Sequence, residues 1–215
     1  MDRQGRPIEA TDHPSQSETM AQEEMIRLKN MHLAPYIQLA TALIGKRRRS
    51  GGNMFRHQID TFGILMDYGY IDSILLKASV IHDLFEAADG LPGVTREAIE
   101  CIDADGPAVY ALVQEVSIRV VDGVREPKSL YLSRVMASGS GRARLLKLAD
   151  RISNMVSLGF VTDRAFVERY VQETRTSILP HAAAINADMH RELSDLVSNR
   201  EHGLKAWQPE APPAP

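Results

Sequence analysis

The sequence predicts an all-α protein that folds as a compact multi-helix bundle. Apolar residues recur at the three- and four-residue spacing of a buried helix face along most of the chain. No stretch shows a convincing alternation of apolar and polar residues, which is the pattern of a half-buried strand. The predicted helices are short and unequal in length, and the sequence contains no internal repeat. These observations favour a bundle over an elongated coil.

Bulk composition bounds the architecture and the partners. The 215 residues are 44% hydrophobic and 25% charged, which suits one globular domain with a sizeable core. We expect that domain at residues 19–200, with disordered tails at 1–18 and 201–215, the second of them rich in proline. A net charge of −3 gives no general attraction to nucleic acid or to an anionic membrane.

The cellular location is predicted from what the chain does not contain. No apolar run approaches the roughly 20 residues that span a bilayer, and the polar N-terminus lacks the apolar core of a signal peptide. The single cysteine, Cys101, excludes an intramolecular disulfide and a cysteine-rich zinc site. We therefore expect a soluble cytoplasmic protein. Helical bundles of this size often pair, so a homodimer stays open.

Helices in the first half of the chain are predicted from caps and apolar stripes. Residues 19–31 form the first, and Pro35 opens the second at its first turn. The third covers Phe55–Tyr68 and ends at Gly69. The fourth, Ile71–Ala88, is apolar around much of its circumference, which predicts a central helix surrounded by others. The stripe of the second helix is expected at Tyr36, Leu39, Ala40, Leu43 and Ile44.

The second half alternates helices with short breaks. Ile118–Val121 can form a short β stretch, but a loop is favoured there. Asp122-Gly123 reads as a turn and residues 138–141 as a flexible joint. The predicted helices are Arg96–Ile102 with Thr95 as its cap, 108–116, 127–136, Arg142–Leu158, a helix capped by Asp163, and 182–197 beyond a break at Pro180.

Residues 45–53 form a basic loop, in which Lys46 and three arginines, Arg47, Arg48 and Arg49, are followed by glycines. One interpretation is a solvated loop whose cations complement the dipole at the end of a helix. Lys/Arg runs also occur in nuclear-localisation and nucleic-acid patches. A third interpretation is a phosphate-binding loop, because the arginine fork matches phosphate oxygens at two points.

Ionisable residues stand inside two predicted apolar helices. His82 and Asp83 are adjacent near the end of one, and Glu86 follows four and three residues later on the same helical face. Asp150 and Asn154 share a face of the other. Buried ionisable groups cost several kcal/mol unless they are paired or bound to a metal, and a divalent metal would supply that compensation.

With His57, these residues give two imidazoles and two carboxylates. A mixed nitrogen and oxygen set suits Mn²⁺, Fe²⁺, Co²⁺ or Mg²⁺, or Zn²⁺ with open positions. Each residue also has a plainer interpretation. His57 can be a surface histidine, the His82-Asp83 pair can bond to the end of its helix, and Asp150 can pair with Lys147 or Arg151.

The joint pattern resembles the HD phosphohydrolase superfamily, whose ligands follow the order H…HD…D. Within it, residues 33–158 look most like the hydrolase domain of the RelA/SpoT family of alarmone synthetase/hydrolases and like their small single-domain relatives. VIHDLFEA resembles the LLHD-x-x-ED box, LLKLADRISNM closely resembles KLADRLxNL, and ALVQEVS resembles the LVxxVT segment between them.

The resemblance implies a metal-dependent phosphohydrolase that removes the 3′-diphosphate of guanosine tetra- or pentaphosphate as pyrophosphate. It implies Mn²⁺ as the usual metal and Glu86 as the acid that activates water, with Asp83 counted among both the catalytic residues and the ligands. The implied metal ligands are His57, His82, Asp83 and Asp150. The implied substrate contacts are Asn154 and one of Arg47, Arg48 or Arg49.

Two departures from the family pattern leave alternatives open. Ala87 stands where the family box has a second acid, and Gln58 follows His57 where the family usually has proline. These losses also fit an HD phosphohydrolase acting on another nucleotide, or a non-catalytic nucleotide sensor. A purely structural helical adaptor that meets a partner through the basic loop is the least favoured reading, because nothing structural requires the four ligand residues.

Overall fold

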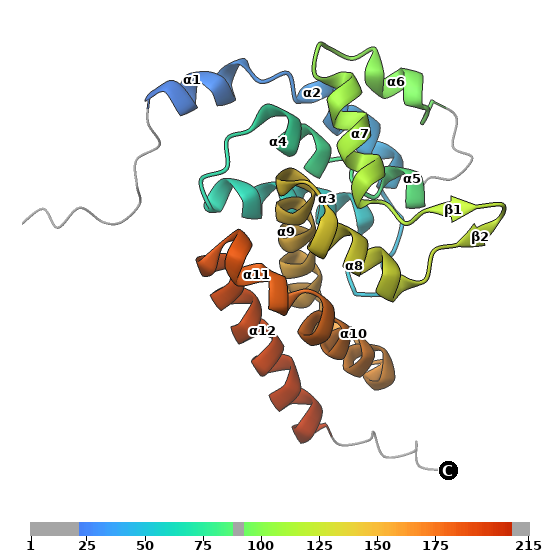
Figure 1. The fold of residues 1–215 in the computed structure, drawn as a ribbon, viewed down its shortest axis with the longest axis vertical. Coiled ribbons are helices and arrows are strands. Elements are labelled where there is room, and N and C mark those ends of the chain that lie inside the picture. The colour runs from blue at the N-terminus through green and yellow to red at the C-terminus, as the bar shows by residue number, and fades with distance from the viewer. Residues whose placement is uncertain (1–21, 88–92, 208–215) are drawn as a thin grey trace, which may run out of the picture.

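A computed structural model describes residues 22–87 and 93–207. Within those ranges the regular structure is almost entirely helical, as predicted, and the helices pack around one apolar core (Figure 1). No helix in these ranges is long and apolar enough to cross a membrane. The predicted tail at 1–18 and residues 208–215 lie outside the described residues, so disorder there stays a prediction.

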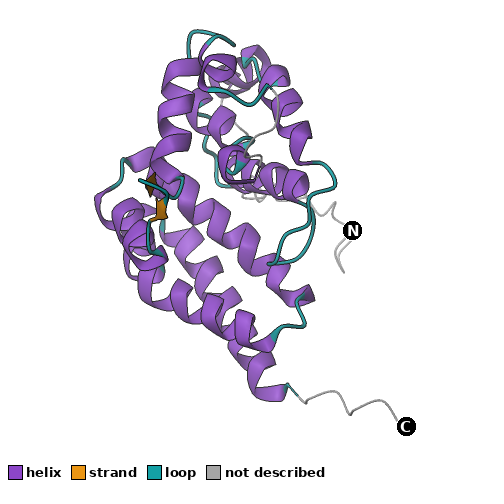
Figure 2. Ribbon diagram, turned by 90° about the vertical axis from the view of Figure 1, so that its right-hand side faces the viewer, coloured by secondary structure: helices purple, strands orange, loops and turns teal. Residues whose placement is uncertain are grey.

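Helix α9 (Gly141–Ser157) passes through the middle of the molecule (Figure 1). A view turned by 90° shows helices on every side and one small pair of strands (Figure 2). The Ser140 side chain caps it by accepting the N–H of Ala143. It contacts α3, α4, α7, α8, α11 and α12. Every residue from Leu145 to Met155 is buried, including the polar ones. Those polar side chains must therefore find partners inside the protein.

Helices α2 (Ala34–Ala40) and α3 (Met54–Asp67) confirm the predictions for the first half. Pro35 lies in the first turn of α2, and Asn53 caps α3 by accepting the N–H of Phe55 at 2.8 Å. The predicted stripe is buried at Tyr36, Ala40 and Leu43, but Ile44 is exposed because the chain leaves the short 3₁₀ helix η1 (Thr41–Leu43) there. Helix α1 (Gln22–Asn30) precedes them.

The predicted central helix Ile71–Ala88 is wrong as a single helix. It divides into α4 (Ser73–Ser79) and α5 (Leu84–Ala87), and residues 80–83 form turns between them. The Ser79 hydroxyl donates to its own helix, to the carbonyl of Leu76 at 2.8 Å, and two β-branched residues follow it. Both features weaken a helix at this point, so His82 and Asp83 lie in the break.

Beyond the break, α6 (Arg96–Glu100) begins at its predicted cap Thr95, and α7 (Gly106–Val116) follows. The loop favoured at Ile118–Val121 is partly wrong. Strands β1 (Val120–Val121) and β2 (Val124–Arg125) form a small antiparallel hairpin that projects from the bundle (Figure 1). Its turn residues, Asp122 and Gly123, both have positive φ, the geometry of a two-residue hairpin turn.

The C-terminal helices pack against α9 from one side (Figure 1). Asp163 caps α10 as predicted, and the predicted break at Pro180 occurs. The helix expected at 182–197 is interrupted at Asn186, whose side chain caps the next helix. That helix extends to Ala206, so residues 201–206 of the expected tail are helical. The helices here are α8 (Lys128–Ser138), α10 (Arg164–Ser177), α11 (Leu179–Ile185) and α12 (Ala187–Ala206), with the 3₁₀ helix η2 (Leu158–Phe160) after α9.

Candidate metal centre

Four predicted ligand side chains converge from α3, the α4–α5 break and α9. The Nε2 atoms of His57 and His82 lie 3.3 Å apart. Asp150 Oδ1 lies 2.9 Å from the Nε2 of His57 and 3.6 Å from that of His82. Asp83 Oδ2 lies 3.4 and 3.6 Å from the same two nitrogens. Two imidazole nitrogens and two carboxylate oxygens thus surround one point, and His57, His82 and Asp150 form a group that can hold a metal ion.

Hydrogen bonds on the outer side of each imidazole suit a metal. His82 Nδ1 lies 2.7 Å from the carbonyl oxygen of Ser79, an acceptor, so this nitrogen carries the proton. The Nε2 lone pair of a neutral His82 is then directed at the other ligands. His57 Nδ1 contacts the hydroxyl of Ser153 at 2.8 Å. Such outer contacts fix ring orientation in metal sites, and the donor set fits a divalent cation.

Asp150 is held by α9 itself. Lys147 donates to its Oδ2 at 2.7 Å, and Asn154 donates to its Oδ1 at 2.6 Å. Burial raises the pKa of Asp150, but the Lys147 charge and the imidazoles outweigh it and hold the pKa well below its ordinary value. The Lys147 pairing considered from the sequence is therefore real, whereas Arg151 contacts Glu173 and Thr174. Asp150 therefore pairs with Lys147 through Oδ2 and contacts the two imidazoles through Oδ1.

The two imidazoles differ in their electrostatics. Burial lowers the pKa of His57. Burial also acts to lower the pKa of His82, but the carboxylates of Asp83 and Asp150 outweigh it and raise that pKa. The pKa of Asp83 is lowered because the histidines outweigh its burial. Both carboxylates are therefore ionised at neutral pH, the state in which they bind cations.

The ligands lie at a cavity of about 340 Å³ that brings together most of the predicted site. Asp83 and Asp150 line it, whereas the imidazoles are buried behind them. The cavity is lined by Arg47, Arg48, Arg49, Ser50, Met54, Asp83, Glu86, Ile118, Lys128, Tyr131, Lys147, Asp150, Arg151, Asn154, Phe166 and Tyr170.

The basic loop folds onto α9 through Asn154. Arg48 and Ser50 both donate to the Oδ1 of Asn154, whose amide donates in turn to Asp150. Gly51 permits this approach, because it has φ +91° and a Cβ there would lie 2.9 Å from the carbonyl oxygen of Ser157. The predicted substrate residue Asn154 is therefore a link between the loop and a candidate ligand.

The other two arginines of the loop behave differently. Arg49 pairs with Asp163 at 3.1 Å and lies over the ring of Phe166. Arg47 is exposed and makes no hydrogen bond or ion pair within the described part of the chain, apart from the backbone bridge to Asn53. Of the three, Arg47 has the guanidinium most available to a ligand.

Glu86 reaches the same cavity although the helix assumed for it is broken. One carboxylate oxygen accepts the backbone N–H of Ile118 at 2.9 Å. The other accepts from Arg125 of the hairpin at 3.1 Å. The structure thus places Glu86 near the ligands and ties it to the segment that leads into β1. The side chain of Ala87 lies outside what the structure describes.

No sequence motif indicated that α8 and α10 form part of the cavity wall. Lys128 lies 3.5 Å from Glu173 and over the ring of Tyr170, and burial lowers its pKa. Arg151 is 1% exposed and also lies over Tyr170. Its Nε has no hydrogen-bond partner within the described residues. Because no local motif marks Lys128, only the fold brings it to this cavity.

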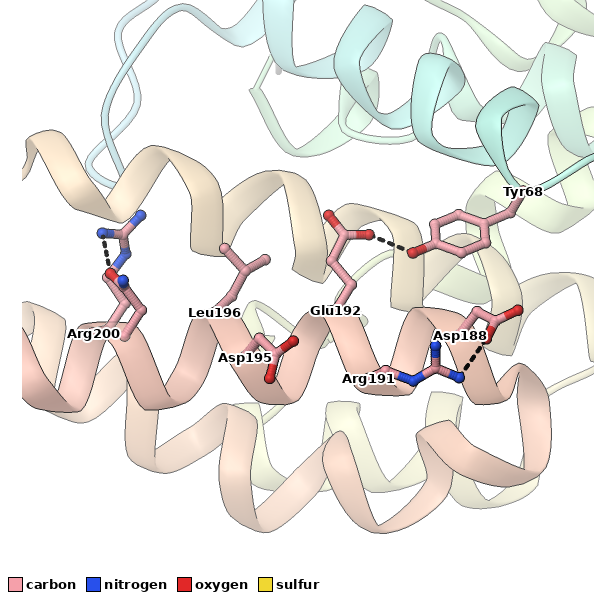
Figure 3. Close-up of a pocket in the computed structure, with 8 residues that line it drawn as sticks. Tyr68, Asp188, Arg191, Glu192, Asp195, Leu196 and Arg200 are labelled. Atoms are coloured by element: carbon pink, nitrogen blue, oxygen red, sulfur yellow. Dashed lines mark hydrogen bonds and ion pairs between the residues drawn. The ribbon is translucent and has the colours of Figure 1, made fainter. Parts of the chain in front are cut away.

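A larger hollow of about 610 Å³ lies elsewhere, along α12 and the end of α3 (Figure 3). Tyr68 donates to Glu192 there at 2.6 Å, and Arg191 pairs with Asp188. None of its lining residues belongs to the predicted ligand set. Because these four side chains already pair with one another and the hollow holds no candidate ligand, we do not assign the site to it.

The chain is similar in sequence to several known proteins. No family model matches the chain. A GTP pyrophosphokinase rsh of Brucella ovis is 28% identical over 158 residues, or 71% of this chain, and the chain spans about a fifth of that protein's length (20%). The human guanosine-3′,5′-bis(diphosphate) 3′-pyrophosphohydrolase MESH1 is 32% identical over 124 residues, covering 57% of this chain and 65% of the human protein.

A solved structure shares the fold. It is described as a metazoan ortholog of SpoT that hydrolyses ppGpp, and it superposes with a TM-score of 0.63 at 24% identity over 80% of this chain and 96% of that one. These findings agree with the resemblance predicted from the sequence motifs: the chain is similar in sequence to the rsh protein and to MESH1, and it shares the all-helical fold of the SpoT ortholog.

Proposed function

We propose that the protein is a metal-dependent phosphohydrolase that releases pyrophosphate from guanosine-3′,5′-bis(diphosphate) or a close analogue. One observation carries the proposal: the two imidazole nitrogens and two carboxylate oxygens meet beside a cavity whose other walls are rich in cations. The relatives support the choice of substrate, because MESH1 is named for this reaction.

The proposed ligands are His57, His82, Asp83 and Asp150. Their mixed nitrogen and oxygen donors suit Mn²⁺, Fe²⁺, Co²⁺, Mg²⁺ or Zn²⁺. The family resemblance favours Mn²⁺ among them. A divalent cation bound there would polarise a phosphoryl oxygen and lower the pKa of a water molecule. The protein's own contribution is orientation, since Ser79, Ser153 and Lys147 fix three of the four ligands.

Glu86 is the proposed proton acceptor. Its carboxylate lines the same cavity as Asp83, the second catalytic carboxylate of the proposal. The contacts from Ile118 and Arg125 hold the Glu86 side chain in one place. A carboxylate placed beside the attacking water can orient it and take its proton. Ala87 offers no second carboxylate, so Glu86 alone fills this role.

Two basic walls support a substrate with phosphates at two positions. The basic loop supplies Arg47, while α8 and α9 supply Lys128 and Arg151. Asn154 and Arg48 are proposed to contact the nucleotide once their mutual hydrogen bond opens toward it. Cations from the loop and from these two helices would stabilise the phosphate charge both in the bound substrate and as it develops during cleavage.

The test is pyrophosphate release from guanosine tetraphosphate by the purified protein with Mn²⁺. An EDTA-treated sample and an Asp150→Asn variant purified in the same way control for hydrolases of the expression host. Metal-dependent release of pyrophosphate and GDP, absent from both controls, is the expected result. Equal release by the variant and the native protein would refute the proposal.

A second candidate is a nucleotide sensor that binds without turnover. Ala87 in place of the family acid favours it, together with the occupation of both Glu86 oxygens by Ile118 and Arg125. Isothermal titration with guanosine tetraphosphate separates the two, because tight binding without product after long incubation identifies the sensor. Turnover of a different nucleotide would identify the remaining alternative. A cytoplasmic location and a homodimer stay predictions.

A further inference from the structure

The break between α4 and α5 separates two backbone groups that a continuous helix would join. In a helix the N–H of Asp83 would donate to the carbonyl of Ser79, four residues earlier. Here the His82 Nδ1–H donates to the Ser79 carbonyl oxygen at 2.7 Å, and the Asp83 N–H donates to Oε1 of Gln58 at 3.3 Å. Side chains thus satisfy both ends of the missing hydrogen bond, which lets the break persist inside the protein.

The other end of the Gln58 amide contacts the same residue. Its Nε2 donates to Oδ2 of Asp83 at 3.2 Å. This oxygen is the one that lies 3.4 Å from His57 Nε2 and 3.6 Å from His82 Nε2. Gln58 therefore holds both the backbone and the carboxylate of Asp83, and it does so from α3, where it directly follows His57.

Burial makes this amide more than a packing residue. Gln58 is 0% exposed, and a buried amide costs free energy unless its hydrogen bonds are made. An apolar side chain of similar size would fill the same space without that cost. Within the described residues, both hydrogen bonds of the Gln58 amide go to Asp83, whose side chain is 24% exposed at the cavity. These contacts indicate that the Gln58 amide serves to hold Asp83 in position.

We propose that Gln58 is a positioning residue that fixes Asp83 as the fourth metal ligand. This inference rests on the metal centre of the proposed function. The proline that the resembled family has after its first histidine carries no side-chain donor or acceptor, so it cannot make this clamp.

The test compares Gln58→Met with Thr61→Val in the full-length protein. Methionine matches glutamine in length but cannot make either hydrogen bond. Thr61 is buried one turn further along α3, and its hydroxyl donates to the backbone carbonyl of His57, so its loss perturbs the same helix without touching Asp83. Mn²⁺ affinity is measured by isothermal titration of apo protein. Unfolding in EDTA checks that each variant is folded without the metal.

The expected result is a Mn²⁺ dissociation constant raised about 10- to 100-fold by Gln58→Met and unchanged by Thr61→Val. Equal affinity in Gln58→Met and the native protein would overturn the clamp and leave the metal centre standing. Native protein that binds no Mn²⁺ would overturn both.

Discussion

The His82 ring donates from Nδ1 to the carbonyl oxygen of Ser79 over 2.7 Å. The bond joins two residues on either side of the end of α4 and replaces a backbone hydrogen bond of the helix. It also determines which ring nitrogen has a free lone pair, because a protonated Nδ1 leaves the lone pair of Nε2 directed at the other candidate ligands. One contact therefore links the break in the helix to the chemistry of the site.

The first prediction concerns the ligands. His82→Ala and Asp83→Ala should each remove bound metal and pyrophosphate release together, because each takes one donor from a four-donor set. Metal content by elemental analysis and product by chromatography measure the two effects. His202→Ala is the matched control, since His202 is exposed on α12 and contacts only Ser198 among the described residues. Retained metal with full activity in both ligand variants would refute the assignment.

Much of the fold could be predicted because its signals are local. Caps at Asn53, Thr95 and Asp163 and the proline at Pro35 mark helix ends with side chains that act within a few residues. The break after Ser79 could not be predicted in this way. The apolar pattern continues through it, and the groups that stabilise it come partly from α3.

The candidate site also has a part that the sequence predicts and a part that it does not. The four candidate ligands could be identified because the HD pattern is carried by residue types that are costly to bury alone. The roles of Gln58 and Lys128 could not be identified, because a glutamine after a histidine and a lysine at the start of a helix form no motif that indicates a functional site. Their contacts to Asp83 and Tyr170 arise from packing between segments distant in sequence.

The second prediction concerns Arg47. Arg47→Ala should raise the KM for guanosine tetraphosphate about tenfold with little change in kcat, because it removes one charge-assisted contact to phosphate of roughly 1.4 kcal/mol. Initial-rate kinetics measure both constants. Arg56→Ala removes an equally exposed arginine that pairs with Asp60 and does not line the cavity. A KM that rises equally in both variants would indicate general electrostatics rather than contact.

The third prediction concerns Lys128, which lines the same cavity as the basic loop but belongs to α8. Lys128→Met should raise the KM for a nucleotide with phosphates at both ends about tenfold, but change little the KM for one with a single phosphorylated end. This result is expected if the basic loop binds one phosphate group and Lys128 binds the other. Lys205→Met, on the last turn of α12, is the control. Equal losses for both nucleotides would contradict a second phosphate position.

The fourth prediction compares two glycines. Gly51→Ala should destabilise the protein by about 1–2 kcal/mol and raise KM, because its φ of +91° and the nearby Ser157 carbonyl oppose a Cβ. Gly63→Ala, inside α3 with open space around it, should stabilise by about 0.5–1 kcal/mol and leave KM unchanged. Urea unfolding and kinetics check both. If Gly51→Ala behaved like Gly63→Ala, the loop would not depend on this approach.

The fifth prediction concerns a buried ion cluster away from the site. Lys77 donates to Asp103 at 2.8 Å and to Asp105 at 2.7 Å. Burial raises the pKa of Asp103, but hydrogen bonds from Lys77 and Tyr36 outweigh it and lower that pKa. Hydrogen bonds from Lys77 and Ser73 lower the pKa of Asp105. Both carboxyls therefore have lower pKa values in the folded protein than in the unfolded chain.

Groups of this kind stabilise the fold at pH values above their unfolded pKa, and the contribution is lost as the pH falls toward their folded pKa. The free energy of unfolding of the native protein should therefore drop as the pH falls below the ordinary aspartate pKa of about 4. Lys77→Met should lower stability by about 2 kcal/mol at pH 7 and flatten this drop, because the carboxyl pKa values then rise. Urea titrations at several pH values measure the slope, with Lys205→Met as the control. An unchanged slope in Lys77→Met would show that other carboxyls govern the acid sensitivity.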